Sequence, residues 1–282
     1  MEHILITGAN SGVGLALAEK LIEQGSFVFG SVRSKSQGES LSSKFGKSFY
    51  PLYFDVTDED AIDKAVKEVA KVLNGKGLSA LVNNAGVVVP GPLLEMPVSS
   101  FRDQLEINLV GPFLISQKFL PLLGAQKDCK FPPGRIINVS SLSGVRTFPF
   151  LSAYSVSKHG LEALTNGFRR ELSLYGIDAI SILPGAILTP LTDKINDTVR
   201  DLAPRSVYRD SLLAFIRLNE RKANSGVPMS KVVDAIMHAL RSSHPKTRYF
   251  LKSSFLTDTF LPKFLPTRIF DKLISKALGI HA

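Results

Sequence analysis

The chain is poor in cysteine, with Cys129 alone among 282 residues. A single thiol excludes an intramolecular disulfide framework and a zinc site built from several cysteines. It fits a reducing compartment, so we expect a cytoplasmic protein without a metal site. The sequence also lacks a run of 18 apolar residues, which argues against a membrane-spanning helix. Its opening, MEHILI, lacks the basic and long apolar regions of a signal peptide.

The composition that is present, 44% hydrophobic and 21% charged residues, is typical of a soluble globular protein. It excludes a disordered or collagen-like chain, because both lack the apolar residues for a core. The length suits one large domain or two small ones. No linker, repeat or low-complexity tract interrupts the sequence, so we predict a single domain over residues 1–282.

The net charge of +9 is distributed unevenly. Residues 241–282 contain eight lysines and arginines against two aspartates, whereas the rest of the chain is close to balanced. No recognition motif accompanies this excess, so we expect no nucleic acid partner. From about 255 to 280 basic and apolar residues alternate. This pattern has two interpretations: a terminal helix packed on the body by its apolar stripe, or a basic amphipathic segment in peripheral contact with an anionic membrane.

Short apolar runs alternate with segments of helix length. The predicted strands are Ile4–Thr7, Phe27–Val32, Phe49–Phe54, Ala80–Asn83, Arg135–Ser140 and Ala179–Leu183. The predicted helices are Gly14–Gln24, Glu59–Leu73, Phe101–Leu123 and Ala153–Tyr175. Nearly continuous apolar strands in strand–helix–strand order predict a doubly wound α/β fold with a parallel sheet. Residues from about 191 to 227 are polar and helical in pattern, so we expect a lid-like insertion there.

The turn after the first predicted strand is rich in glycine, with the sequence TGANSGVG at residues 7–14. Glycine lets the backbone approach a pyrophosphate, and a helix N-terminus offers it free N–H groups and a positive dipole. The spacing G-x-x-x-G-x-G differs from the common dinucleotide fingerprint G-x-G-x-x-G. We predict a dinucleotide site here; the alternative is a tight turn without a ligand.

The end of the second predicted strand indicates which dinucleotide binds. An acidic side chain at this place would accept a hydrogen bond from the ribose 2′-hydroxyl of NAD. This chain instead has Val32 followed by Arg33, with Lys35 nearby. A guanidinium pairs with a 2′-phosphate through charge-assisted hydrogen bonds, so we predict NADP(H) as the preferred cofactor, with NAD(H) as the alternative. Arg33 as a solvated loop residue is the competing interpretation.

Tyr154 and Lys158 stand four residues apart in YSVSK, hence on one face of a predicted helix. A free tyrosine has a pKa of about 10. We expect the ammonium of Lys158 to lower the pKa of Tyr154 and so suit the phenol to proton transfer in carbonyl reduction. Ser141, 13 residues upstream at a strand end, is a candidate to hold the substrate oxygen. A serine hydrolase is not indicated, because G-x-S-x-G does not occur.

Together these motifs resemble the short-chain dehydrogenase/reductase family over residues 3–190, in particular members acting on lipophilic carbonyls or alcohols such as steroids or retinoids. The resemblance is carried by residues 7–14, NNAG at 83–86, Asp55, Asn108, Ser141, YSVSK at 154–158 and PGAILT at 184–189. It implies a Rossmann-type doubly wound parallel sheet in three layers. It also implies an NADP(H)-dependent oxidoreductase that moves a hydride between nicotinamide and a lipophilic ketone, aldehyde or secondary alcohol.

The resemblance further implies roles for single residues. Tyr154 is the expected general acid/base, and Lys158 is expected to lower its pKa and hold the nicotinamide ribose. Ser141 is expected to bind the reacting oxygen, and Asn108 to kink its helix and hold a relay water. The expected cofactor-binding residues are Gly8, Asn10, Ser11, Gly12, Val13, Gly14, Arg33, Asp55, Val56, Asn84, Ala85, Gly86, Tyr154, Lys158, Pro184, Gly185, Ile187 and Thr189.

The residues that follow Ser141 are expected to face the substrate. Ser143 and Val145 join Ser141 and Tyr154 as predicted substrate-binding residues, and mainly apolar neighbours favour a lipophilic ligand. Members of the family pair long helices, so a homodimer or homotetramer is expected. Two alternatives remain: a non-catalytic NADP-binding regulatory or scaffold protein on the same fold, and an extended-type epimerase or dehydratase that shares Y-x-x-x-K.

Overall fold

A computed structural model describes residues 1–187, 191–224, 226–251 and 265–280. Its seven strands form one parallel sheet in the order β3-β2-β1-β4-β5-β6-β7. The strands are β1 His3–Ile6, β2 Phe27–Val32, β3 Phe49–Tyr53, β4 Ala80–Asn83, β5 Arg135–Val139, β6 Asp178–Pro184 and β7 Arg248–Leu251. The order reverses between β1 and β4, and open sheets of this kind bind ligands beyond the carboxyl ends of the strands at such a point.

The helices lie between the strands and after the sheet. They are α1 Gly12–Glu23, α2 Lys35–Phe45, α3 Glu59–Leu73, α4 Val98–Leu105, α5 Gly111–Phe119, α6 Ser152–Glu171, α7 Leu191–Leu202, α8 Arg209–Asn224, α9 Met229–Arg241 and α11 Thr267–Leu278. Short turns are η1 Gly46–Ser48, the π-helical η2 Glu106–Val110, η3 Leu120–Leu123, η4 Leu142–Gly144, η5 Leu172–Tyr175 and η6 Ala203–Arg205.

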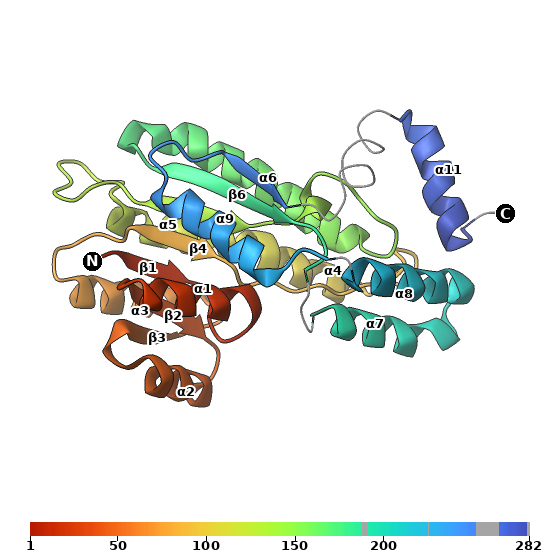
Figure 1. Cartoon of the computed structure of the whole chain (residues 1–282), viewed down its shortest axis with the longest axis horizontal. Coiled ribbons are helices and arrows are strands. Elements are labelled where there is room, and N and C mark those ends of the chain that lie inside the picture. Colours follow the sequence, from red (N-terminus) through yellow and green to blue (C-terminus); the bar gives the residue numbers. More distant parts are fainter. Residues whose placement is uncertain (188–190, 225, 252–264, 281–282) are drawn as a thin grey trace.

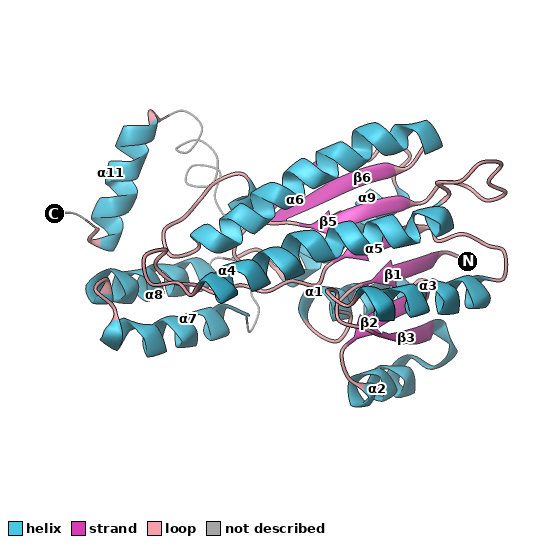
Figure 2. Ribbon diagram, turned by 180° about the vertical axis from the view of Figure 1, so that it is seen from behind, coloured by secondary structure: helices cyan, strands magenta, loops and turns pink. Residues whose placement is uncertain are grey.

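Two helical layers cover the two faces of the sheet. On one face α1 and α9 pack their buried residues, such as Leu17 and Ile236, on the strands (Figure 1). On the other face α3, α5 and α6 contribute residues such as Ile62, Phe119 and Phe168 (Figure 2). Each helix has an apolar stripe at three- and four-residue spacing, which suits burial of one side. The predicted three-layer fold with a doubly wound parallel sheet is confirmed.

A third apolar cluster lies apart from the sheet, in α7, η6, α8 and α11, and includes Phe150 from the loop before α6. Its buried residues are Phe150, Val199, Ala203, Leu212, Phe215, Ile216 and Leu278. Figure 1 shows α7, α8 and α11 together at one end of the molecule, away from the N-terminus. We call these four elements the cap. Within the described residues of the tail, Ile274 and Leu278 pack on the cap core, as the packing interpretation requires. Residues 255–264 of the predicted tail lie outside the described residues.

The structure differs from the sequence prediction in four elements. The predicted helix 101–123 is not continuous, because η2 interrupts it between α4 and α5. The helices α2 and α9 and the edge strand β7 carry no prediction. Residues 126–133 lie in the connection between η3 and β5. Over the described ranges, every helix is too short or too polar to cross a membrane.

Candidate active site

The glycine-rich turn between β1 and α1 needs glycine for its backbone and for its packing. Gly8 and Gly12 have positive φ angles of 67° and 55°, which other residues rarely adopt. At Gly14 a Cβ atom would come within 2.6 Å of Nδ2 of Asn84, closer than real contacts allow. The turn therefore accepts no larger residue without a shift of its neighbours.

Thr7 and Asn84 fasten this turn to the one after β4. Oγ1 of Thr7 accepts hydrogen bonds from the backbone N–H groups of Asn84 and Ala85, each at 3.0 Å. The side-chain amide of Asn84 donates in return to the carbonyl oxygens of Thr7 and Gly8, at 2.9 and 3.2 Å. The amide of Asn84, predicted to bind cofactor, thus shapes the loop itself. Thr7 was part of the motif but carried no predicted role.

The first turn of α1 is open to an anion. The N-cap residue Ser11 makes no side-chain cap hydrogen bond, and the first turn contains no acidic residue. Ser11 and Gly12 are exposed and Asn10 is half-buried, whereas the side chain of Val13 is buried in the core. Free N–H groups and the helix dipole at such an end suit a pyrophosphate. The residues present therefore fit the predicted dinucleotide, with Val13 offering only its backbone.

The end of β2 presents a cation. Arg33 is exposed and makes no ion pair or hydrogen bond within the described ranges, while Lys35 lies 3.7 Å from the carboxylate of Glu39. Ser34 caps α2 by accepting from the backbone N–H of Gln37. No acidic side chain occupies the place where a ribose 2′-hydroxyl would be held, which is compatible with a phosphate there.

Asp55 and Val56 lie in the turn after β3. Oδ1 of Asp55 accepts hydrogen bonds from the N–H and the hydroxyl of Thr57, at 3.1 and 2.8 Å. Val56 is buried and would be 3.0–3.2 Å from a Cβ atom at Gly111. Asp55 thus shapes its own turn with one oxygen, and Val56 presents an apolar wall that packs on the start of α5.

Asn108 is fully buried in the π-helical turn η2. Its Oδ1 accepts from the N–H of Val87 at 2.8 Å, and its Nδ2 donates to the carbonyl oxygen of Val87 at 2.8 Å and to Oγ of Ser157 at 3.1 Å. A Cβ atom at Gly86 would lie 3.1 Å from Oδ1 of Asn108. The predicted irregularity of this helix is present as a π turn, because the Asn108 side chain bonds across to the β4 turn.

Lys158 is buried on α6 one turn after Tyr154. Its Nζ donates a hydrogen bond to the carbonyl oxygen of Val139, at 2.9 Å, and lies 5.8 Å from the centre of the Tyr154 ring. Ser157 links the pair to η2, since its hydroxyl donates to the carbonyl oxygen of Tyr154 at 2.7 Å and accepts from Asn108. Ser157 therefore joins Asn108 to the backbone of Tyr154 by hydrogen bonds, and Lys158 lies beside the Tyr154 ring.

Ser141 reaches the same site from η4. It is the N-cap of η4, where its hydroxyl accepts from the N–H of Ser143 at 3.0 Å, and it is hydrogen-bonded to Tyr154. Ser143 is half-buried and Val145 is 43% exposed, so both lie at the surface of the turn that leads away from Ser141. All four predicted catalytic side chains therefore belong to one connected site at the carboxyl edge of the sheet.

The protonation of the site corrects one prediction. Burial raises the pKa of Tyr154 above its ordinary value, and the hydrogen bond with Ser141 opposes that shift. Burial lowers the pKa of Lys158 to about 8, against the charge of Glu162. The pKa of Tyr154 is therefore raised, where a lowered value was predicted. The Nζ of Lys158 donates to Val139 and lies 5.8 Å from the centre of the phenol ring.

The segment after β6 contains the last of the predicted cofactor-binding residues. Pro184 ends β6, the N–H of Gly185 donates to the carbonyl oxygen of Leu251 at 2.8 Å, and Ile187 pairs with Val227. Ile187 packs on the core formed by α1 and α9. Thr189 lies outside the described residues. The Ile187–Val227 bridge fixes where the chain leaves the sheet toward the cap.

Two groups of this site escaped the sequence analysis. Ser157 lies inside Y-x-x-x-K, and its place one residue before Lys158 gave no reason to link it to Asn108. Glu162 follows Lys158 by four residues, a spacing that puts both on one helix face and would have signalled the electrostatic interaction between them.

Comparison with known proteins gives a consistent result. The family model "short chain dehydrogenase" matches residues 2–200. An NADPH-dependent 3-dehydrocapnine reductase of Ornithobacterium rhinotracheale is 38% identical, over 99% of this chain and 98% of its own. Retinol dehydrogenase 16 of Mus musculus is 33% identical, over 94% and 86%, and 17-beta-hydroxysteroid dehydrogenase type 6 of Homo sapiens is 30% identical, over 98% and 88%.

A solved structure agrees with the fold. A short-chain dehydrogenase from Streptomyces avermitilis superimposes with a TM-score of 0.74 at 25% identity, covering 99% of this chain and 97% of that one. The match of the family model over most of the chain and the identity to full-length relatives point to the same group of oxidoreductases. The chain belongs to the short-chain dehydrogenase family.

Proposed function

We propose that this protein reduces a lipophilic ketone or aldehyde with NADPH, or oxidises the matching secondary alcohol with NADP. The observation that carries the proposal is the connected set Ser141, Tyr154, Lys158 and Asn108 at the carboxyl edge of the sheet. A scaffold protein without turnover would not need these four groups to be gathered in one place.

The glycine-rich turn and the first turn of α1 would hold the pyrophosphate, and Arg33 the 2′-phosphate. Asp55, Val56 and Ala85 would lie along the adenosine, and Lys158 and Ile187 at the nicotinamide end. A bound NADPH would supply the hydride. The similarity to a relative named as NADPH-dependent supports this choice of cofactor over NADH.

In the proposed reduction Tyr154 donates its proton to the carbonyl oxygen, and Ser141 orients that oxygen by a hydrogen bond. The raised pKa of Tyr154 keeps the phenol protonated and ready to donate at neutral pH. Lys158 stabilises the negative charge that the phenol acquires, which requires its ammonium form. Asn108 holds the turn after β4 against α6, so that these groups keep their places.

The cap supports a lipophilic substrate. The ring of Phe215 contacts those of Phe148 and Phe150, with centroids 6.3 and 5.9 Å apart. Phe148 and Phe150 belong to the segment that follows Ser141 and η4, so the apolar cluster begins a few residues from the reacting oxygen. The relatives named for retinol, a steroid and 3-dehydrocapnine are consistent with an apolar substrate.

NADPH oxidation followed at 340 nm with a panel of long-chain ketones, steroid ketones and retinoid aldehydes tests the proposal. We expect turnover with at least one lipophilic carbonyl and a clear preference for NADPH over NADH. NADPH binding without turnover across the panel would favour the regulatory alternative.

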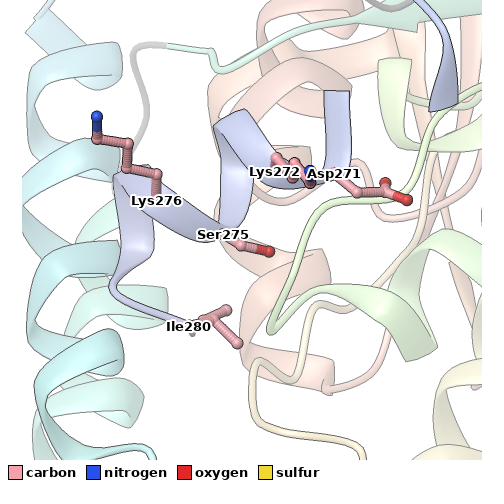
Figure 3. A pocket seen from close by; sticks show the side chains of 5 residues that line it. All are labelled: Asp271, Lys272, Ser275, Lys276 and Ile280. Carbon is pink, nitrogen blue, oxygen red and sulfur yellow. The ribbon is translucent and has the colours of Figure 1, made fainter. Parts of the chain in front are cut away.

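The outer face of α11 supports a peripheral contact with an anionic membrane. Ile269 and Leu273 are 49% and 50% exposed, and the exposed basic residues Arg268, Lys272 and Lys276 lie on the same helix face. Beside them Asp271, Lys272, Ser275, Lys276 and Ile280 line an open pocket of about 550 Å³ (Figure 3). Basic and aliphatic side chains in this arrangement bind negatively charged lipid surfaces. Co-sedimentation with vesicles containing phosphatidylserine tests the contact, and equal binding to neutral vesicles would contradict it.

A further inference from the structure

Glu162 is a buried acid on α6, one turn after Lys158, and the proposed chemistry does not use it. Its side chain is 4% exposed. Its Oε2 accepts a hydrogen bond from Nε of Arg248 on the edge strand β7, at 2.8 Å. Its Oε1 is buried without a hydrogen-bond partner among the residues described. Burial of an ionised carboxylate costs free energy unless neighbouring charges stabilise it. The buried ammonium of Lys158, one turn away on the same helix, is such a charge.

The turn that contains Ser141 packs against Glu162 and the backbone of Lys158. Gly144 ends η4, and a Cβ atom there would lie 3.1 Å from Cγ of Glu162 and 2.9 Å from the carbonyl oxygen of Lys158. Oγ of Ser140, at the end of β5, would be 2.9 Å from that atom. Glu162, the backbone of Lys158 and the Ser141 turn therefore form one close-packed unit, in which a change at Glu162 is felt at the reacting groups.

The charged groups around Lys158 come from two elements. Tyr154 and Glu162 flank it on α6, and Arg248 faces Glu162 from β7. The neighbouring β5, η4 and η2 present the uncharged side chains Ser140, Ser141 and Asn108. Glu162 thus supplies a negative charge one helical turn from Lys158 that acts on its ammonium, and Arg248 partly neutralises that charge.

We propose that Glu162 is a positioning residue that keeps the buried Lys158 in its ammonium form, with Arg248 holding the carboxylate in place and limiting its effect. The inference rests on the proposed function, because a cation beside Tyr154 matters only if Tyr154 gives up a proton. Burial lowers the pKa of Lys158 to about 8, and the charge of Glu162 opposes this shift. Since the pKa of Tyr154 is raised, Lys158 is the group that deprotonates first as the pH increases.

Two substitutions should move this titration in opposite directions. Glu162→Gln keeps the size and can still accept from Arg248, but it removes the negative charge, so the alkaline limb of kcat for ketone reduction should move to lower pH by about one unit. Arg248→Gln leaves Glu162 without its counter-charge, so the limb should move to higher pH. Structural damage alone would lower kcat in both variants without opposite shifts.

The experiment measures kcat against pH from 6 to 10 for the wild type, both variants and the control Glu171→Gln, which removes an exposed charge near the end of the same helix. NADPH affinity across the same pH range, from fluorescence titration, gives a second readout, because Lys158 is proposed to contact the nicotinamide ribose. The midpoints of both curves should shift in the variants and stay in place in the control.

Unmoved midpoints in folded variants, or shifts in the same direction for Glu162→Gln and Arg248→Gln, would overturn the inference. If Glu162→Gln does not fold, Arg248→Gln and the conservative Glu162→Asp, expected to keep the wild-type midpoint, decide the question. Failure of the proposed function looks different: the wild type then oxidises no NADPH with any ketone, and the binding midpoints still test Glu162.

Discussion

The reacting edge of the sheet and the cap above it are built from different interactions. At the sheet edge, Thr7, Asn84, Asn108 and Lys158 are held by directional hydrogen bonds to backbone groups of neighbouring turns. The cap core consists of apolar side chains, with exposed ion pairs such as Arg200–Glu220 outside it. Hydrogen bonds fix positions closely, whereas apolar packing tolerates changes of shape. One fold can thus keep one reaction and select different substrates.

The largest effect is expected from a change at Tyr154, at the reacting edge of the sheet. Tyr154→Phe removes the proton donor and should lower kcat about 10²- to 10⁴-fold, the usual contribution of a general acid. NADPH affinity should stay within about twofold, because the phenol hydroxyl is proposed to act on the substrate. Steady-state kinetics and fluorescence titration measure the two. The control Tyr175→Phe alters a tyrosine in η5 that is 40% exposed and should leave both values unchanged; an equal loss in both variants would contradict the assignment.

Phe215→Ala tests the cap. Phe215 is 2% exposed and contacts Phe148 and Phe150, so its truncation should cost about 3–5 kcal/mol of packing free energy. KM for a long-chain ketone should rise while kcat for a short ketone persists. Thermal unfolding and kinetics with both ketones check this, with Val207→Ala, 81% exposed in the same region, as the matched control. An unchanged ratio of the two KM values would show that the cap does not select the substrate.

The sequence anticipated the reacting edge far better than the cap. Glycine spacing, Y-x-x-x-K and a serine at a strand end are local patterns, and the structure brings these residues together. The sequence does not predict α2, because its serines and lysines leave few apolar residues. It does not predict β7, because the apolar run Tyr249–Leu251 is too short to distinguish an edge strand from a loop.

The protonation states could not be predicted, because they depend on tertiary contacts. The position of the Lys158 ammonium beside Tyr154 depends on its hydrogen bond to Val139, a residue 19 positions away. The π turn at Asn108 likewise results from bonds to Val87 on another element. Periodicity within a helix contains neither piece of information.

Arg33→Asp tests the part of the sheet edge that is proposed to select NADPH over NADH. It replaces the cation proposed for the 2′-phosphate by a carboxylate that repels it, so the preference for NADPH over NADH should fall about 10- to 100-fold. The kcat/KM ratio for the two cofactors measures it. Lys47→Asp places the same charge change in η1, before the start of β3 and away from the carboxyl edge, and should not alter the ratio. A preference that does not move would show that Arg33 is a solvated loop residue.

The smallest expected effect concerns α11. Lys272→Gln should weaken binding to phosphatidylserine vesicles by about 1 kcal/mol, roughly fivefold, and leave turnover of a soluble ketone unchanged. Vesicle co-sedimentation gives the affinity. Lys67→Gln, an exposed lysine of α3, is the control and should bind like the wild type. Equal weakening by both variants would mean that net charge, and not the outer face of α11, drives the contact.

The transfer of an isotope label tests the central claim most directly. With NADPH carrying deuterium at both C4 positions of the nicotinamide ring and a lipophilic ketone, we expect the wild type to form product with deuterium on the carbinol carbon, and Tyr154→Phe to form it far more slowly. Product without deuterium, or equal labelled product from Tyr154→Phe, would contradict the proposal that this site joins a hydride from the cofactor to a proton from Tyr154.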